Sequence, residues 1–193
     1  MTKVLMIDNY DSFTFNLVQI LENVQGCEVE VVRNDKFSLE KVEEYAKIIL
    51  SPGPGLPSEA GLMQDVVKTF SSTKSILGVC LGHQCIAEVF GGELYNLEIP
   101  RHGKVSTIEV LDSQEVLFQG LPEKVVVGRY HSWAVRKESL PSCFTISSVA
   151  DDGVIMSLRH KEYNVCGVQF HPESILTPHG ITMLCNWISE EEL

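Results

Sequence analysis

The chain has 193 residues, of which 15 are Lys or Arg and 26 are Asp or Glu, so its formal net charge at pH 7 is -11. This surplus of acid opposes attraction to nucleic-acid phosphates and anionic lipids, and we expect neither nucleic acid nor a membrane as a partner. The hydrophobic fraction of 44% is typical of a globular protein with one buried core, so we expect residues 1–193 to form a single domain. The opening residues lack the pattern of a secretory signal, and no apolar run reaches the length of a bilayer span, which predicts a cytoplasmic location.

Strand and helix patterns alternate along the first half of the chain. The first helix carries Phe13, Leu17, Ile20, Leu21 and Val24 at helical spacing and stops at Gly26. The expected strands are 3–8, 28–32, 47–50 and 75–79, and the expected helices are 13–24, 38–45 (opened by Ser38), 62–70 and 81–90. Alternation of this kind builds a parallel sheet with helices on both faces.

The second half is rich in strand patterns separated by short turns. Strands are expected at 104–111, 124–133, 144–150, 153–160 and 164–170, as antiparallel additions at one edge of the sheet. The last helix is expected over 180–193, with Ile181, Leu184, Cys185 and Ile188 along one face. The predicted fold is α/β: a single domain with a mixed, mainly parallel central sheet flanked by helices and an added antiparallel β region.

Residues 78–82 read Gly-Val-Cys-Leu-Gly at the expected junction between a strand and a helix. A sharp turn of this type holds a nucleophile clear of its neighbours, and a glycine on either side relieves the crowding. The start of a helix favours a thiolate, and the free amide of Leu81 points toward an oxyanion. Cys80 is therefore the candidate nucleophile. The alternative is a small buried packing residue, which accounts for Cys85; the six cysteines follow no disulfide framework and predict reduced thiols.

A cysteine nucleophile needs a base, and the base needs a group that orients it. In the segment "GVQFHPES" a strand ends at His171, and Glu173 follows two positions later, on the same side of extended chain. Pro172 between them stiffens the backbone. Because parallel strands bring their carboxyl ends to one edge of a sheet, His171 can meet Cys80 there. The predicted site is a Cys-His-Glu triad.

Five other histidines compete for this role. His83 is expected to point away from the thiol, and His131 can line the same pocket, whereas His102, His160 and His179 carry no clear signal. The Gly- and Pro-rich segment 51–61 lacks the lysine that ends a phosphate-binding loop, so a nucleotide site is not expected there. At the edge of the sheet its backbone amides can supply a second oxyanion donor.

Three segments in order, "SPGPGLP", "GVCLGHQ" and "GVQFHPES", resemble the glutaminase domain of class I (triad) glutamine amidotransferases over almost the whole chain. The segments "DNYDSFTFNL", "HGK" and "RYHSW" are similar to the small subunit shared by anthranilate synthase and 4-amino-4-deoxychorismate synthase. Relatives commonly carry leucine where this chain has Trp133; because the implied contact is through the main chain, this difference changes little.

The resemblance implies that Cys80 attacks the side-chain amide of L-glutamine, that His171 transfers protons and that Glu173 orients His171. The backbone N–H groups of Leu81 and Gly53 are implied to hold the oxyanion. The implied glutamine-binding residues are Gly53, Pro54, Gly55, Leu81, Gln84, Ser132 and Trp133.

The family also implies a hetero-oligomer, in which ammonia passes through an enclosed passage to a chorismate-binding synthase subunit. No metal or cofactor is expected in this chain, and Mg²⁺ is expected in the partner. We expect the interface to include residues 9–13, 52–55 and 102–104. Alternatives are a stand-alone cysteine hydrolase acting on γ-glutamyl substrates, the glutaminase subunit of another amidotransferase such as GMP synthetase, and a binding module with an inert cysteine. The choice between anthranilate synthase, aminodeoxychorismate synthase or both is left open at this stage.

Overall fold

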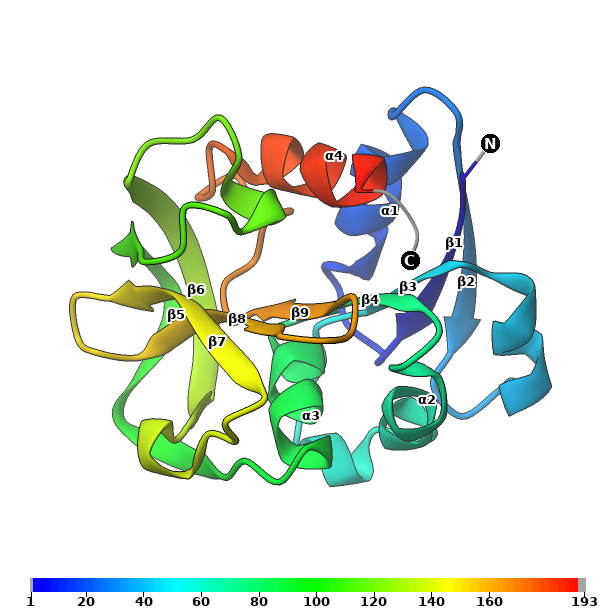
Figure 1. The fold of residues 1–193 in the computed structure, drawn as a ribbon, viewed down its shortest axis with the longest axis horizontal. Coiled ribbons are helices and arrows are strands. Elements are labelled where there is room, and N and C mark those ends of the chain that lie inside the picture. The colour runs from blue at the N-terminus through cyan, green and yellow to red at the C-terminus, as the bar shows by residue number, and fades with distance from the viewer. Residues whose placement is uncertain (1, 191–193) are drawn as a thin grey trace.

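The computed structural model describes residues 2–190, so the part of the last predicted helix that covers 191–193 lies outside it. A nine-stranded sheet in the order β2-β1-β3-β4-β9-β8-β7-β5-β6 runs through the molecule (Figure 1). The strands are β1 Thr2–Asp8, β2 Cys27–Arg33, β3 Lys47–Leu50, β4 Ser75–Val79, β5 Leu94–Val110, β6 Lys124–Val135, β7 Phe144–Ala150, β8 Ile155–His160 and β9 Val165–Val168.

Both halves of the chain contribute to this one sheet. Strands β2, β1, β3, β4 and β9 pair in parallel, whereas β8, β7, β5 and β6 extend the sheet by antiparallel pairing. The predicted fold class is confirmed. One strand of the second half behaves differently from the prediction, because β9 joins β4 in parallel and only its other edge is antiparallel, to β8.

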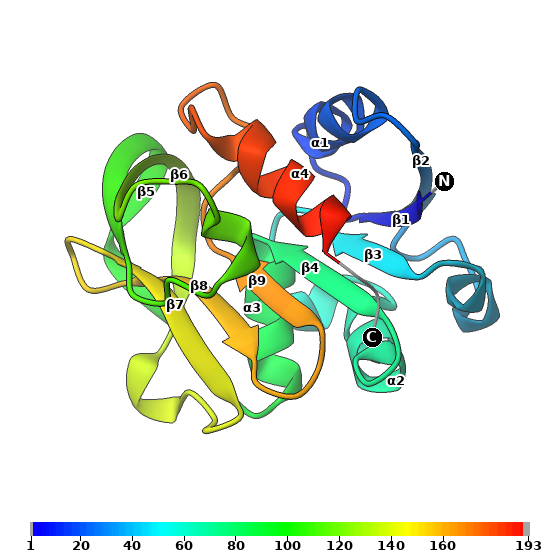
Figure 2. The same ribbon diagram turned by 45° about the horizontal axis from the view of Figure 1, so that its top comes forward.

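Helices cover both faces of the parallel part of the sheet (Figure 1 and Figure 2). They are α1 Thr14–Glu22, α2 Met63–Phe70, α3 Leu81–Val89 and α4 Gly180–Ser189. Helices α1 and α4 pack in one hydrophobic cluster with Val4 and Met6 of β1, and helices α2 and α3 pack in a second cluster with Leu5 and Ile7. Alternate residues of a strand point to opposite faces, so a continuous apolar run buries both. None of the described helices is long and apolar enough to cross a membrane.

Two elements differ in detail from the sequence prediction. The segment expected as a helix over 38–45 is a 3-10 helix, Leu39–Glu44, and Ser38 makes no side-chain cap. Within Leu39–Glu44 only Val42 is buried, which is too little packing to stabilise a longer α-helix. Strand β5 begins at Leu94, well before the predicted start at residue 104. Residues 94–96 pair with residues 133–135 at the end of β6, and a bulge separates this pairing from the rest of the ladder.

The apolar face predicted for the last helix matches the buried face of α4 only in part. Ile181 is 60% exposed and Cys185 is only partly buried, whereas Met183 and Trp187 lie in the core beside the predicted Leu184 and Ile188. Ile181, in the first turn of α4, lines a surface groove instead. Helical spacing alone cannot tell which of two adjacent apolar stripes meets the sheet.

Candidate active site

Cys80 occupies a strained turn between β4 and α3. Its backbone angles are φ 52° and ψ -99°, a conformation that residues other than glycine rarely adopt. A Cβ atom on Gly78 would lie 2.4 Å from the backbone of Gly82, and one on Gly82 would lie 2.4 Å from the carbonyl oxygen of Leu50. The two glycines are therefore required by close backbone packing, and the turn presents the sulfur at the end of the strand.

The register of β4 and β9 brings the catalytic candidates to one edge of the sheet. Val79 pairs with Val168 in parallel, and the backbone N–H of Cys80 donates to the carbonyl of Val168 at 2.8 Å. The chain that leaves β9 therefore passes directly beside the elbow, and His171 and Glu173 lie on it. Nδ1 of His171 is 2.6 Å from Oε1 of Glu173, and both side chains are buried.

The electrostatics of His171 follow from this arrangement. Burial acts to lower the pKa of His171, but the Cys80 sulfur and the Glu173 carboxylate outweigh it and raise that pKa well above its usual value. Nε2 of His171 makes no hydrogen bond to any described residue, so this nitrogen is free to exchange a proton. An imidazole beside a cysteine sulfur is the arrangement that activates a thiol as a nucleophile.

A cavity of about 260 Å³ opens at Cys80. The predicted residues Gly53, Pro54, Gly55, Gln84, Ser132 and Trp133 line it, together with His102, Tyr130 and His131. Leu81, His171 and Glu173 are not part of its lining; Leu81 is 1% exposed and begins α3, where the first amides have no acceptor within the helix. His131 lies where the sequence placed it, whereas His102, for which the sequence suggested no catalytic role, also borders the cavity.

Asn9, at the end of β1, holds the loop that carries Gly53. Its backbone N–H donates to Oγ of Ser51 and its side-chain Nδ2 donates to the carbonyl of Ser51, both at 2.8 Å. Asn34 donates to Oδ1 of Asn9 at 3.0 Å. A Cβ on Gly53 would lie 2.5 Å from the Cβ of Asn9, so the loop rests directly on this side chain. The sequence placed residues 9–13 only at a partner interface and missed this internal contact.

His131 is held neutral. Arg129 can only donate, and its Nε is 3.1 Å from Nε2 of His131, so that nitrogen accepts and Nδ1 donates to the carbonyl of Trp133 at 2.8 Å. Burial, with a smaller contribution from the Arg129 charge, lowers the pKa of His131 to about 3. His131 therefore fixes the backbone that lines the cavity and carries no proton to the reaction.

His83, His160 and two buried thiols are poor candidates for chemistry. His83 is fully buried against Gly167, and burial lowers its pKa to about 4. His160 stacks on Tyr163, with ring centroids 4.4 Å apart. Burial raises the pKa of the Cys85 and Cys166 thiols, which keeps both protonated at neutral pH. The prediction that Cys85 is a packing residue agrees with its position in the core.

Two aromatic rings, those of Phe13 and Tyr130, pack against the His171 imidazole. The ring centroids of Phe13 and Tyr130 lie 5.3 Å and 4.9 Å from that of His171. Beyond them is a groove of about 460 Å³ lined by residues of α1, by the segment after β9 and by Ile181. Ile175 in this groove is 96% exposed, so an apolar surface adjoins the site.

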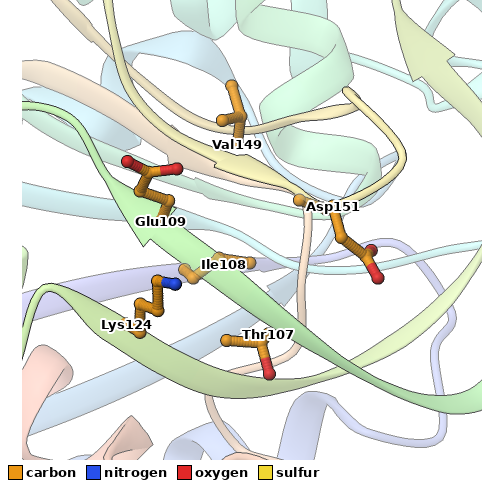
Figure 3. A pocket seen from close by; sticks show the side chains of 7 residues that line it. Thr107, Ile108, Glu109, Lys124, Val149 and Asp151 are labelled. Carbon is orange, nitrogen blue, oxygen red and sulfur yellow. The ribbon is translucent and has the colours of Figure 1, made fainter.

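A separate hollow of about 150 Å³ lies over β5, β6 and β7 (Figure 3). The side chains of Glu109, Lys124 and Asp151 surround it, with Ile108 between them. Its lining includes no cysteine or histidine and none of the predicted site residues, so we place the candidate active site at Cys80.

Comparisons with known proteins agree with this geometry. The family model described as glutamine amidotransferase class-I matches residues 5–190. The aminodeoxychorismate/anthranilate synthase component 2 of Bacillus subtilis is 48% identical over 187 residues, which cover 96% of this chain and 95% of the relative. The anthranilate synthase component 2 of Pseudomonas aeruginosa is 48% identical over 195 residues, covering 97% of this chain and 96% of the relative. A solved structure from Thermoplasma acidophilum, assigned as a GMP synthase subunit, superposes with a TM-score of 0.87 at 26% identity and covers 97% of this chain and 92% of its own.

Proposed function

We propose that this chain, which belongs to the class-I glutamine amidotransferase family, is the glutaminase component of a synthase that aminates chorismate. The chain hydrolyses L-glutamine to glutamate and ammonia and delivers the ammonia to the synthase subunit. The observation that carries the chemical part is the strained Cys80 elbow beside the His171 imidazole, which is 2.6 Å from the Glu173 carboxylate.

In the proposed mechanism the Cys80 thiolate attacks the γ-carbonyl carbon of glutamine, while His171 holds the proton that the thiol has lost. The C–N bond breaks as His171 returns this proton to the leaving nitrogen, so ammonia departs and a γ-glutamyl thioester remains. His171 then takes a proton from water as the water attacks the thioester, and glutamate leaves with regeneration of the thiol. Glu173 orients the imidazole and stabilises its positive form.

The substrate assignments extend this proposal. The N–H groups of Leu81 and Gly53 are proposed to hold the tetrahedral oxyanion, a type of contact worth about 3 kcal/mol of barrier for each donor. Gly55, Pro54, Gln84, Ser132 and Trp133 are proposed to bind the amino-acid end of glutamine. Their position around the cavity at Cys80 supports this assignment.

A partner subunit follows from the chemistry of ammonia. Ammonia released into neutral water is mostly ammonium, which has no free lone pair, so an enclosed passage to the synthase is required. The relatives are named as second components, which supports a hetero-oligomer with a chorismate-binding subunit. The exposed apolar surface at Ile175 and Ile181, beside His171, supports a partner face here.

The proposed reaction needs a thiol, an imidazole and hydrogen-bond donors, and we assign no metal or cofactor to this chain; Mg²⁺ is assigned to the synthase subunit. A cytoplasmic location stays a prediction, supported by the six free thiols. The identity of 48% to two second components of chorismate-related synthases favours these over a GMP synthetase partner.

The deciding experiment reconstitutes the chain with the large subunit of an anthranilate synthase or, separately, of an aminodeoxychorismate synthase, and it identifies the aromatic amine formed. We expect Cys80→Ser to abolish glutamine-dependent synthesis and to leave ammonia-dependent synthesis intact. Cys85→Ser, a buried thiol on the adjoining helix, serves as the matched control and should retain both activities. Loss of both activities in Cys80→Ser would refute the division of labour between the two components.

Labelling provides a second test. A glutamine-like chloro ketone should alkylate Cys80 in preference to the other five cysteines, since Cys85 and Cys166 are buried as neutral thiols. A label mapped elsewhere by mass spectrometry argues against the assignment. Steady ammonia release by the isolated chain, unchanged by either synthase, would instead favour a stand-alone hydrolase of γ-glutamyl substrates.

A further inference from the structure

A continuous series of hydrogen bonds connects the cavity wall to the Cys80 sulfur. Nε2 of Gln84 is 2.9 Å from the carbonyl oxygen of Trp133 and 3.0 Å from Oε1 of Gln169. Nε2 of Gln169 is in turn 3.6 Å from Sγ of Cys80. The fully buried Gln169 side chain therefore lies between a substrate-pocket residue and the nucleophile.

The direction of each bond in this series follows from chemistry. A backbone carbonyl can only accept, so the Gln84 atom that faces Trp133 must be the amide nitrogen. This nitrogen can only donate, so the Gln169 atom that faces it must be the amide oxygen. The nitrogen of Gln169 is consequently the atom that faces the Cys80 sulfur, and it donates to that sulfur.

The position of Gln169 follows from the sheet register. Val79 pairs with Val168 in the parallel β4–β9 ladder, and Cys80 and Gln169 are the residues that directly follow these two strands. The backbone N–H of Gln169 donates to Met156 at 2.8 Å, which extends the pairing with β8 and fixes its main chain. The backbone that carries the Gln169 side chain is thus fixed between β4 and β8, which favours precise geometry at the sulfur.

We propose that Gln169 is a further catalytic residue, whose side-chain N–H stabilises the Cys80 thiolate; this inference rests on the proposed glutaminase function. A hydrogen bond to a charged acceptor is stronger than one to its neutral form, so the donor favours ionised sulfur. His171 receives the proton from the thiol, and Gln169 exchanges none. During attack the sulfur loses its negative charge to the new S–C bond, and during thioester hydrolysis the charge returns to sulfur as the bond breaks.

Gln169 also determines which atom of Gln84 faces the substrate. Both hydrogens of the Gln84 amide are used, one on Trp133 and one on Gln169. Oε1 of Gln84 is the atom left to meet a ligand in the cavity, and an oxygen acceptor suits the ammonium group of an amino acid. One buried amide therefore aligns a substrate contact and stabilises the nucleophile.

The test measures the pH dependence of Cys80 alkylation by iodoacetamide in the full chain, followed by mass spectrometry of the Cys80 peptide. Gln169→Met removes the donor at similar volume. Gln169→Glu keeps an acceptor for Gln84 and loses the donor to sulfur. In both variants we expect the midpoint of the rate profile to rise by about one pH unit, with roughly tenfold slower labelling at neutral pH.

Gln64→Met on α2 is the matched control, because the Gln64 side chain donates to Glu88 at 3.4 Å, away from the elbow. Its profile should equal that of the wild-type chain. In the reconstituted complex the Gln169 variants should lose about tenfold in glutamine-dependent kcat and retain ammonia-dependent synthesis, a split that general misfolding would not produce.

Unchanged labelling profiles in both Gln169 variants, with a normally reactive wild-type chain, would overturn this inference alone. A wild-type chain without selective Cys80 labelling or glutaminase activity would instead overturn the proposed function. Should neither variant fold, the side-chain amide NMR signals of Gln169 in the wild-type chain decide the question. They should shift when Cys80 is alkylated, and constant signals would overturn the inference.

Discussion

Replacing Asn9 by leucine tests whether the loop at the active site depends on the end of β1. Leucine has a similar size and no hydrogen-bonding groups, and Asn9 is only 2% exposed. The change removes the donor to the Ser51 carbonyl and the acceptor for Asn34. The backbone bond from residue 9 to Oγ of Ser51 is kept, so the loop is loosened without being released.

The magnitude can be estimated from these contacts. Two buried polar groups lose a partner, each at a cost of about 1 to 3 kcal/mol, so we expect the free energy of unfolding to fall by about 2 to 6 kcal/mol. Gly53 lies against Asn9, and the Gly53 amide is a proposed oxyanion donor. Complete loss of such a donor costs about 10² to 10³ in kcat, so a partly displaced loop should cost roughly 10 to 100-fold.

Two assays separate these effects. Urea unfolding of the chain measures the stability loss, and the reconstituted complex gives glutamine-dependent kcat, with ammonia-dependent synthesis as the internal reference. Asn23→Ala, which removes an exposed hydrogen bond to Gln19, is the control and should leave both quantities nearly unchanged. A variant that loses stability but keeps the wild-type kcat refutes the argument that Asn9 positions the loop.

Three further predictions follow from the site. His171→Ala should lower glutaminase kcat by about 10⁴-fold and Glu173→Ala by about 10²-fold, because His171 transfers the proton whereas Glu173 only orients the imidazole. Equal losses in kcat contradict these roles. Since burial lowers the pKa of His131 to about 3, only its unfolded form gains a proton below its usual pKa, and stability falls as pH falls. The control is His131→Gln, which keeps His171, so the opposite pH dependence of His171 cancels when the two proteins are compared. Relative to this variant, the free energy of unfolding of the wild type in urea should fall by about 2 kcal/mol between roughly pH 7 and pH 5. An equal pH dependence in the two proteins argues against a neutral buried imidazole. Gly82→Ala should destabilise the chain by about 3 kcal/mol or more in thermal unfolding, because the new Cβ would lie 2.4 Å from a carbonyl oxygen, and a wild-type Tm contradicts the close packing at the elbow.

The sequence predicted the parts of the molecule that depend on local patterns. Residues 78–82 indicate a strained strand-to-helix turn because a cysteine with a glycine two positions away on each side suits close backbone packing, and the φ of 52° at Cys80 agrees. His171 and Glu173 are two positions apart in extended chain, so their pairing is a local property as well. The alternation of strands and helices in the first half likewise gave the parallel sheet.

Other features depend on how distant segments align, and the sequence did not reveal them. The inward stripe of α4 and the early start of β5 depend on which surfaces meet after folding. The contact between Asn9 and the Gly53 loop joins segments that are separated by a full strand-helix unit, and no local pattern marks it.

The sequence by itself determined the elbow, the His-Glu pair and the alternation of strands and helices in the first half, because each depends on residues close together in the chain. The tertiary structure alone decided that Gln169 donates to Cys80, since that contact requires the residue-by-residue register of β4 against β9, two strands joined through the whole antiparallel region. A shift of one residue would turn the Gln169 side chain to the opposite face of the sheet, so long-range pairing, which no local pattern specifies, sets this donor.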